Sequence, residues 1–183
     1  MKSTLCVFLC SFIFPLYTIA QDDVPDETDR TEVKFNAFNL LALELLDVSY
    51  ETLINEESSF GVGVLVNIGN TDGIFDYYRT FSLTPFYRRY FSKGYASGFF
   101  IEGFGMINSG EEDDFIYNEI TMENERTGDK YTDFALGISI GGKFISKRGF
   151  VVEVYSGIGR NFLSDEFTPE VVGRGGVSLG FRF

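Results

Sequence analysis

The sequence contains no histidine and no tryptophan, and its two cysteines, Cys6 and Cys10, both lie near the start of the chain. Without histidine, the chain lacks the base of the Ser-His and Asp-His arrangements that many hydrolases use. Without cysteine beyond residue 10, it has no disulfide framework, and a transition-metal site would have to consist of carboxylates alone. The sequence therefore predicts no catalytic, cofactor or metal site, and we expect a protein that is not an enzyme.

Basic residues are scarce as well. The chain has 15 lysines and arginines against 27 acidic residues, which gives a formal net charge of −12 at pH 7. Nucleic acids call for a basic surface, so we expect no nucleic-acid partner.

After the first twenty residues, no stretch approaches the roughly 18 consecutive apolar residues of a transmembrane helix.

Residues 1–20, MKSTLCVFLCSFIFPLYTIA, have the pattern of an export signal peptide. Lys2 gives a positive start, residues 5–16 are apolar, and Ala20 supplies the small residue before cleavage. An apolar run of about twelve residues is too short for a membrane anchor. A lipoprotein signal through Leu9 and Cys10 would require cleavage inside this run. We therefore expect an exported protein, whose formal charge changes from −12 to −13 when Lys2 leaves with the signal.

The rest of the chain divides into an acidic segment and a long region of alternating residues. Residues 21–32, QDDVPDETDRTE, are expected to form a disordered linker. From residue 33 to 183, apolar residues alternate with small or polar ones, a period-two pattern that predicts β-strands. The stretch 40–46, LLALELL, also fits a short helix. The predicted strands cover residues 33–42, 45–53, 59–68, 80–91, 97–107, 131–145, 149–159 and 173–183.

The connections between these strands alternate between short and long. The short ones lie at 54–58, 92–96 and 146–149, and the long ones at 69–79, 108–130 and 160–172. The first connection, near 43–45, is an exception because it is short. Short turns at one end and long loops at the other are typical of outer-membrane barrels. We therefore predict an all-β fold over residues 33–183, an eight-stranded antiparallel up-and-down transmembrane β-barrel.

The composition of the two strand faces distinguishes a membrane barrel from a soluble one. A soluble barrel of the lipocalin kind has an apolar interior and a hydrated outer face, and a membrane barrel has the reverse. The less apolar face here is mostly glycine, serine and alanine with isolated charges, instead of the residues that solvate an exposed sheet. This favours a membrane barrel with its apolar face in lipid. A secreted soluble barrel that binds an apolar ligand is an alternative.

Two longer blocks and the end of the chain carry a family resemblance. The blocks are YRRYFSKGYASGFFIEGFGMIN (87–108) and GGKFISKRGFVVEVYSGIGRNF (141–162), and the chain ends in GFRF. With the signal peptide, they resemble the small outer-membrane β-barrel proteins of Bacteroidetes-type Gram-negative bacteria, which have an OmpA/OmpX-type architecture. The resemblance implies a fold and an outer-membrane location, but members of this group are largely of unassigned function. Phe181 and Phe183 resemble the signal by which barrel-assembly machinery recognises its clients.

Charged residues also occur on the predicted interior face. These are Glu51, Arg88, Glu102, Lys143, Glu153 and Arg182. Three carboxylates and three cations predict a paired interior network, because an unpaired buried charge costs several kcal/mol. A proton or ion relay, or a gate, is the alternative interpretation. Side chains fill the lumen of an eight-stranded barrel, which leaves no obvious cleft for a glycosidase-type carboxylate pair.

The long connection 108–130 carries eight acidic and two basic residues. On the outer surface it is a candidate contact region for lipopolysaccharide, through shared divalent cations, or for a basic partner. Residues 115–122 also fit an extension of the flanking strands as a hairpin. We expect a monomer in contact with outer-membrane lipid and lipopolysaccharide, with a structural or surface-interaction role. A narrow ion or small-solute channel is the alternative within the membrane.

Aromatic residues gather near the predicted strand ends. Such residues suit the aromatic girdles of membrane barrels, where the ring lies in lipid and the hydroxyl in water. The candidates are Tyr77, Tyr78, Tyr87, Tyr90, Phe91 and Tyr95.

Overall fold

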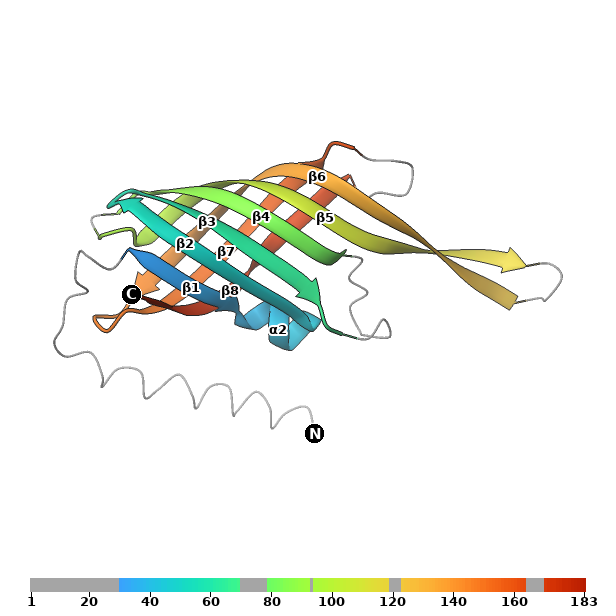
Figure 1. Ribbon diagram of the computed structural model, residues 1–183, viewed down its shortest axis with the longest axis horizontal. Helices are drawn as coiled ribbons and strands as arrows, with labels where there is room; N and C mark the ends of the chain where they lie inside the picture. Colours follow the sequence, from blue (N-terminus) through green and yellow to red (C-terminus); the bar gives the residue numbers. More distant parts are fainter. Residues whose placement is uncertain (1–29, 70–78, 93, 119–122, 164–169) are drawn as a thin grey trace, which may run out of the picture.

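The alternating segments form eight antiparallel strands that close into a barrel in the computed structural model, which describes residues 30–69, 79–92, 94–118, 123–163 and 170–183 (Figure 1). Each strand pairs with its neighbours in the chain, and the last strand pairs with the first. The prediction of an all-β, eight-stranded antiparallel barrel is therefore confirmed. The strands are β1 (Thr31–Asn36), β2 (Leu45–Asn55), β3 (Ser58–Asn67), β4 (Arg79–Tyr90), β5 (Gly98–Asn118), β6 (Glu123–Ile145), β7 (Phe150–Asn161) and β8 (Val171–Arg182).

The two ends of the barrel differ in their connections. Strands β2 and β3 are joined by a turn at Glu56 and Glu57, and β6 and β7 by residues 146–149. Residues 91–92 and 94–97, between β4 and β5, lie at this same end, and so do the start of β1 and the end of β8 (Figure 1). We call it the short-turn end and its opposite the loop end.

The predicted first strand, 33–42, is wrong in its second half. Strand β1 ends at Asn36, and a short helix, α2 (Ala37–Leu43), follows at the loop end. The Asn36 side chain caps this helix by accepting a hydrogen bond from the Asn39 amide, and Glu44 ends it in a left-handed conformation. Alanine and leucine favour the helix between these caps. The connection between the first two strands, which was the exception to the alternation of short and long connections, therefore contains a helix. This helix contacts β2 and β8. Within the described ranges, no helix is both long and apolar enough to cross a membrane.

Strands β5 and β6 run much further than the sequence pattern predicted. Their pairing continues without interruption from Gly98 opposite Lys143 to Asn118 opposite Glu123. The pairing of β4 with β5 reaches only to Gly110, and that of β6 with β7 begins at Ala135. Beyond these points the two strands project from the loop end as a ribbon (Figure 1). The segment predicted as a loop, 108–130, is therefore largely a strand pair, as the hairpin alternative for 115–122 suggested, while residues 119–122 lie outside the described part.

Large apolar side chains cover the outside of the barrel, and charged, small and aromatic side chains fill its inside. Phe144, Ile138 and Ile158 are 68%, 64% and 60% exposed, while glutamates, lysines and arginines of the alternate positions are buried. Inward glycines make room for the interior rings, because a Cβ at Gly61 would lie 2.3 Å from the Phe86 ring. The distribution is the reverse of that in a lipocalin-type barrel.

Candidate functional site

The six charged residues predicted to face the interior all lie inside the barrel. Each is at most 3% exposed. They come from six different strands, β2 and β4 to β8, and each occupies the alternate position whose neighbours in sequence face outward. They are Glu51, Arg88, Glu102, Lys143, Glu153 and Arg182.

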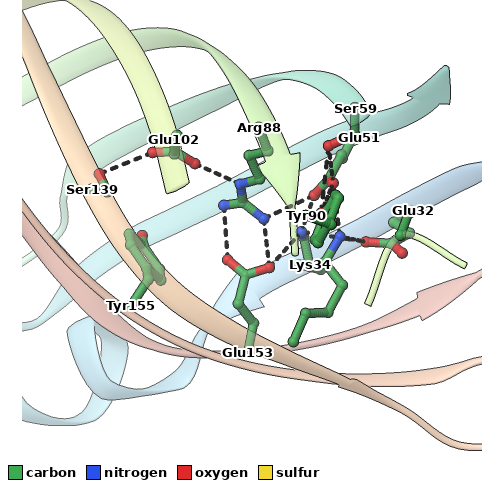
Figure 2. Close-up of polar contacts among 12 residues, drawn as sticks. Glu32, Lys34, Glu51, Ser59, Arg88, Tyr90, Glu102, Ser139, Glu153 and Tyr155 are labelled. Carbon is green, nitrogen blue, oxygen red and sulfur yellow. Dashed lines mark hydrogen bonds and ion pairs between the residues drawn. The ribbon is translucent and has the colours of Figure 1, made fainter. Parts of the chain in front are cut away.

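Arg88 lies at the centre of this group and contacts three carboxylates (Figure 2). Its Nε donates to Glu102 at 2.6 Å, and its two terminal nitrogens donate to the two oxygens of Glu153 at 2.6 and 2.8 Å. One terminal nitrogen also donates to Glu51 at 3.0 Å. The guanidinium lies 4.5 and 4.4 Å from the ring centroids of Phe86 and Phe100. Ion pairs and aromatic rings therefore fix the position and the orientation of the Arg88 guanidinium.

Glu51 is the second centre of the network. It accepts hydrogen bonds from Arg88, from Lys34 and, at 2.7 Å, from Lys143. The hydroxyl groups of Ser59 and Tyr90 also donate to it, the latter at 2.6 Å. Five donors converge on one carboxylate, so Glu51 is charged and held in place by its surroundings.

Toward the short-turn end, the network continues across the closure between β1 and β8. Glu32 accepts from Lys143 at 2.8 Å and from two nitrogens of Arg182 at 2.8 and 2.6 Å. Arg182 also donates to the backbone oxygens of Tyr95 and Ala96, both at 3.0 Å. These contacts join the β4–β5 connection to the barrel wall, and the lumen is filled at this level.

Sequence reasoning missed three members of the network: Glu32, Lys34 and Arg174. Glu32 lay in the segment predicted as a linker, although β1 begins at Thr31. Lys34 contacts Glu51 and, at 2.8 Å, Glu153. Arg174 contacts Glu102. Lys34 lies between the apolar residues Val33 and Phe35, and this alternation could have identified it as an inward-facing charge. With these three, the network has four glutamates and five cations.

Above the network, toward the loop end, the lumen contains a cavity of about 450 Å³. Arg174 and Tyr155 border it on the side of the network, and Phe38 and Leu43 of α2 border it on the side of the loop end. Asp47 also lines it. The carboxylate of Asp47 accepts from the side-chain amides of Asn36 at 3.1 Å and Asn39 at 2.8 Å, contacts that fix α2 against the barrel.

The predicted aromatic girdle needs one correction. Tyr90 is 2% exposed and lies inside the barrel, because it shares the inward parity of Arg88. Tyr87 and Phe91 are 48% and 59% exposed and lie on the outside, and Tyr95 packs partly buried against an interior cluster. Tyr77 and Tyr78 lie outside the described residues.

The remaining predicted features concern the two ends of the chain. Phe181 and Phe183 are 50% and 58% exposed, and Phe181 lies on the outer face of β8. Their role as an assembly signal stays a prediction. The predicted signal peptide, 1–20, lies outside the described residues, and so does the linker 21–32 apart from its last three positions.

The arrangement has the chemistry of a fixed plug. The glutamates and cations of the network are buried and bonded to one another. In the part of the chain that the structure describes, no three histidine, cysteine, aspartate or glutamate residues are placed to hold a metal ion. Comparisons of the chain with protein-family models, curated proteins and solved structures found no match.

Proposed function

We propose that this protein is an outer-membrane β-barrel with a structural or surface-interaction role and no enzymatic activity. The observation that carries the proposal is the inversion of the barrel: large apolar side chains outside and paired charges inside. Apolar surface that stays in water is less stable, by about 25 cal/mol per Å², than the same surface covered by lipid. A secreted soluble barrel is therefore the weaker alternative.

Further features of the outer face support a membrane location. Strands β2, β3, β4, β7 and β8 have 10 to 12 residues, and about 9 to 11 residues span a bilayer at the tilt of a barrel strand. Outward ion pairs occur at the strand ends, between Arg89 and Glu57 at the short-turn end and between Arg160 and Glu170 at the loop end. Charges at both ends and apolar residues between them fit a lipid-exposed band. Export by residues 1–20 is part of this proposal.

The surface role rests on the ribbon of β5 and β6. This ribbon extends beyond the barrel wall at the loop end, and the segment 108–130 has eight acidic and two basic residues. Its natural partners are cationic, either a basic protein surface or divalent ions shared with lipopolysaccharide. A channel is the weaker alternative within the membrane, because the charge network fills the lumen at the short-turn end.

Cell fractionation and electrophoresis test the location. We expect the protein in the outer-membrane fraction, and we expect unheated samples in dodecyl sulfate to migrate faster than boiled ones, since the closed barrel resists unfolding. A periplasmic or secreted protein would appear in the soluble fraction. Recovery there, with no difference between heated and unheated samples, would contradict the proposal.

Planar-bilayer recording tests the absence of a channel. We expect the purified, folded protein to insert without reproducible single-channel steps, because Arg88, Glu51 and Glu153 meet in the middle of the lumen. Reproducible steps would instead favour the channel, provided that Arg88→Gln changed their conductance. A larger porin recorded under the same conditions is the positive control.

A further inference from the structure

The charges around the loop-end cavity balance one another. The lumen adds Asp47, Asp133 and Arg79 to the four glutamates and five cations of the network, which makes six acidic and six basic side chains among the described residues. Asp47 interacts electrostatically with Arg174 and, less strongly, with Arg79. A charged molecule in the cavity would bring a buried charge without a partner, so the lining suits an uncharged occupant.

Arg174, which borders the cavity on the side of the network, is held by its own contacts. One of its terminal nitrogens donates to Glu102. Its guanidinium lies 5.1, 5.5 and 5.3 Å from the ring centroids of Phe86, Phe104 and Tyr155. This arginine therefore forms the floor of the cavity, and the groups that could bind an occupant lie on the walls above it.

Two hydroxyl groups on the wall of β4 have unused hydrogen-bonding capacity. Ser82 and Thr84 line the cavity and are only 2% and 3% exposed. Within the part of the chain that the structure describes, neither hydroxyl has a hydrogen-bond partner. Each can donate one hydrogen bond and accept two, and the two residues lie about 7 Å apart along one face of the strand. Buried polar groups are rarely left unpaired, so this wall suits a polar occupant.

Two acceptor oxygens lie on the side of β2 and α2. Asp47 uses Oδ2 to accept from Asn36 and Asn39, and among the described residues its Oδ1 accepts no hydrogen bond. Asn39 is 7% exposed and donates through its backbone and side-chain amides, while its own Oδ1 has no donor in the described ranges.

The strand register places these acceptors across from the hydroxyl groups. Asp47 and Ser82 both pair with Leu65 of β3, so they lie on its two sides, roughly 9–10 Å apart along the wall. A molecule between them can donate hydrogen bonds to the acceptors of β2 and α2 and exchange them with the hydroxyl groups of β4. Only a molecule with several hydroxyl groups can do both.

The remaining walls of the cavity are largely apolar. Phe38 and Leu43 of α2, Met106 of β5 and Val172 of β8 line it. The volume of about 450 Å³ lies within the range of about 300–1,000 Å³ that is typical of ligand pockets. A ring with hydroxyl groups at its rim and C–H groups on its faces fits both kinds of wall.

We propose that this cavity binds an uncharged polyol with the size of one hexose ring. Its hydroxyl groups bond to Ser82 and Thr84 on one side and to Asp47 and Asn39 on the other, and its C–H faces pack against the apolar walls. The proposal goes beyond the proposed function and is independent of it, since the lining is internal in a membrane barrel and in a soluble one.

An NMR titration of the folded protein tests this proposal, in micelles of lauryldimethylamine oxide because this detergent contains no sugar. The probes are D-glucose and D-galactose. We expect at least one of them to shift the amide signals of Ser82, Thr84 and Asn39 saturably, with one site per chain. Cyclohexylmethanol, which has a similar ring without the ring hydroxyl groups, should bind at least tenfold more weakly, because the polar groups of the walls stay unpaired.

D-Glucuronate is the charged counterpart of glucose. We expect it to bind at least tenfold more weakly than the neutral hexose, because its carboxylate finds no cation in a balanced lining. Absence of saturable binding for both hexoses would overturn the proposal. Equal affinity for cyclohexylmethanol would do so as well, because the cavity would then select apolar molecules, and so would equal affinity for glucuronate.

Variants without the hydroxyl groups locate the site. The double substitution Ser82→Ala and Thr84→Val leaves the cavity open and removes two polar partners, and we expect at least tenfold weaker binding of the hexose. Thr132→Val is the matched control, since Thr132 is exposed on the outer face, and it should leave binding unchanged. Heat-modifiable migration checks that each variant is folded. Native affinity in the folded double variant would show that the assignment is wrong.

Discussion

Replacing Arg88 with glutamine is expected to lower the free energy of unfolding by about 3–5 kcal/mol. The substitution removes the cation that contacts Glu51, Glu102 and Glu153, and it leaves these carboxylates buried with fewer partners. Breaking a buried ion pair on one side costs more than the pair contributes, because the remaining charge keeps its desolvation penalty. Urea unfolding of the barrel in lipid vesicles, followed by tyrosine fluorescence and gel migration, measures the change.

The neighbouring residue provides a matched control. Arg89 points outward, its side chain is 50% exposed, and it contacts Glu57, which is also exposed. We expect Arg89→Gln to change the free energy of unfolding by no more than about 0.5 kcal/mol. Arg88→Lys should fall between the two, because an ammonium group cannot reproduce the planar contacts with Glu153 and Glu102. Equal effects of Arg88→Gln and Arg89→Gln would contradict a buried network.

The second large effect is expected on the outer face. Ile138 lies on β6 halfway along the barrel, paired with Gly103 and Ile158, and its side chain is 64% exposed. In a membrane, Ile138→Arg places a charge in the hydrocarbon layer, which costs about 2–4 kcal/mol at the bilayer midplane. We expect less folded protein in the outer-membrane fraction and a correspondingly lower free energy of unfolding in vesicles.

The same substitution distinguishes a membrane barrel from a soluble one. In a soluble barrel, an arginine at an exposed position would change the free energy of unfolding by no more than about 0.5 kcal/mol. Thr132→Arg is the matched control, since Thr132 is exposed on the same face of the same strand but lies near the loop end. It should insert and fold like the native protein. Normal folding of Ile138→Arg would count against insertion in lipid.

Alternation along the sequence was sufficient to predict the barrel and much of its interior. Because side chains of a strand alternate between faces, the positions of Val152 and Val154 on the apolar face determined that Glu153 would face the other way. The charges could then be assigned to one side, although no sequence pattern gives the distances between them.

The parts that could not be predicted depend on contacts between distant segments. The helix α2 is capped by Asn36 and held by Asp47, and the sequence LLALELL fits a strand about as well as a helix. Arg174 lies in a glycine-rich stretch, GRGG, in which few side chains mark the alternation. Its neighbour Gly176 has a φ of 144°, and a Cβ there would lie 2.3 Å from the Asn36 side chain. This close approach of Gly176 to Asn36 exists only in the folded barrel, where β8 pairs with β1.

The closure of β1 on β8 depends on the register in which the two strands pair. On the outside, Val33 lies opposite Phe181 and Phe35 opposite Leu179, and apolar pairs of this kind tolerate a shift of two residues. Inside, Glu32 lies directly opposite Arg182, and the same shift would place it opposite Gly180. The two partners are 150 residues apart in sequence, and they face each other only where β1 pairs with β8. The buried charges therefore favour the observed register of this strand pair, a choice that the apolar residues of the outer face cannot make.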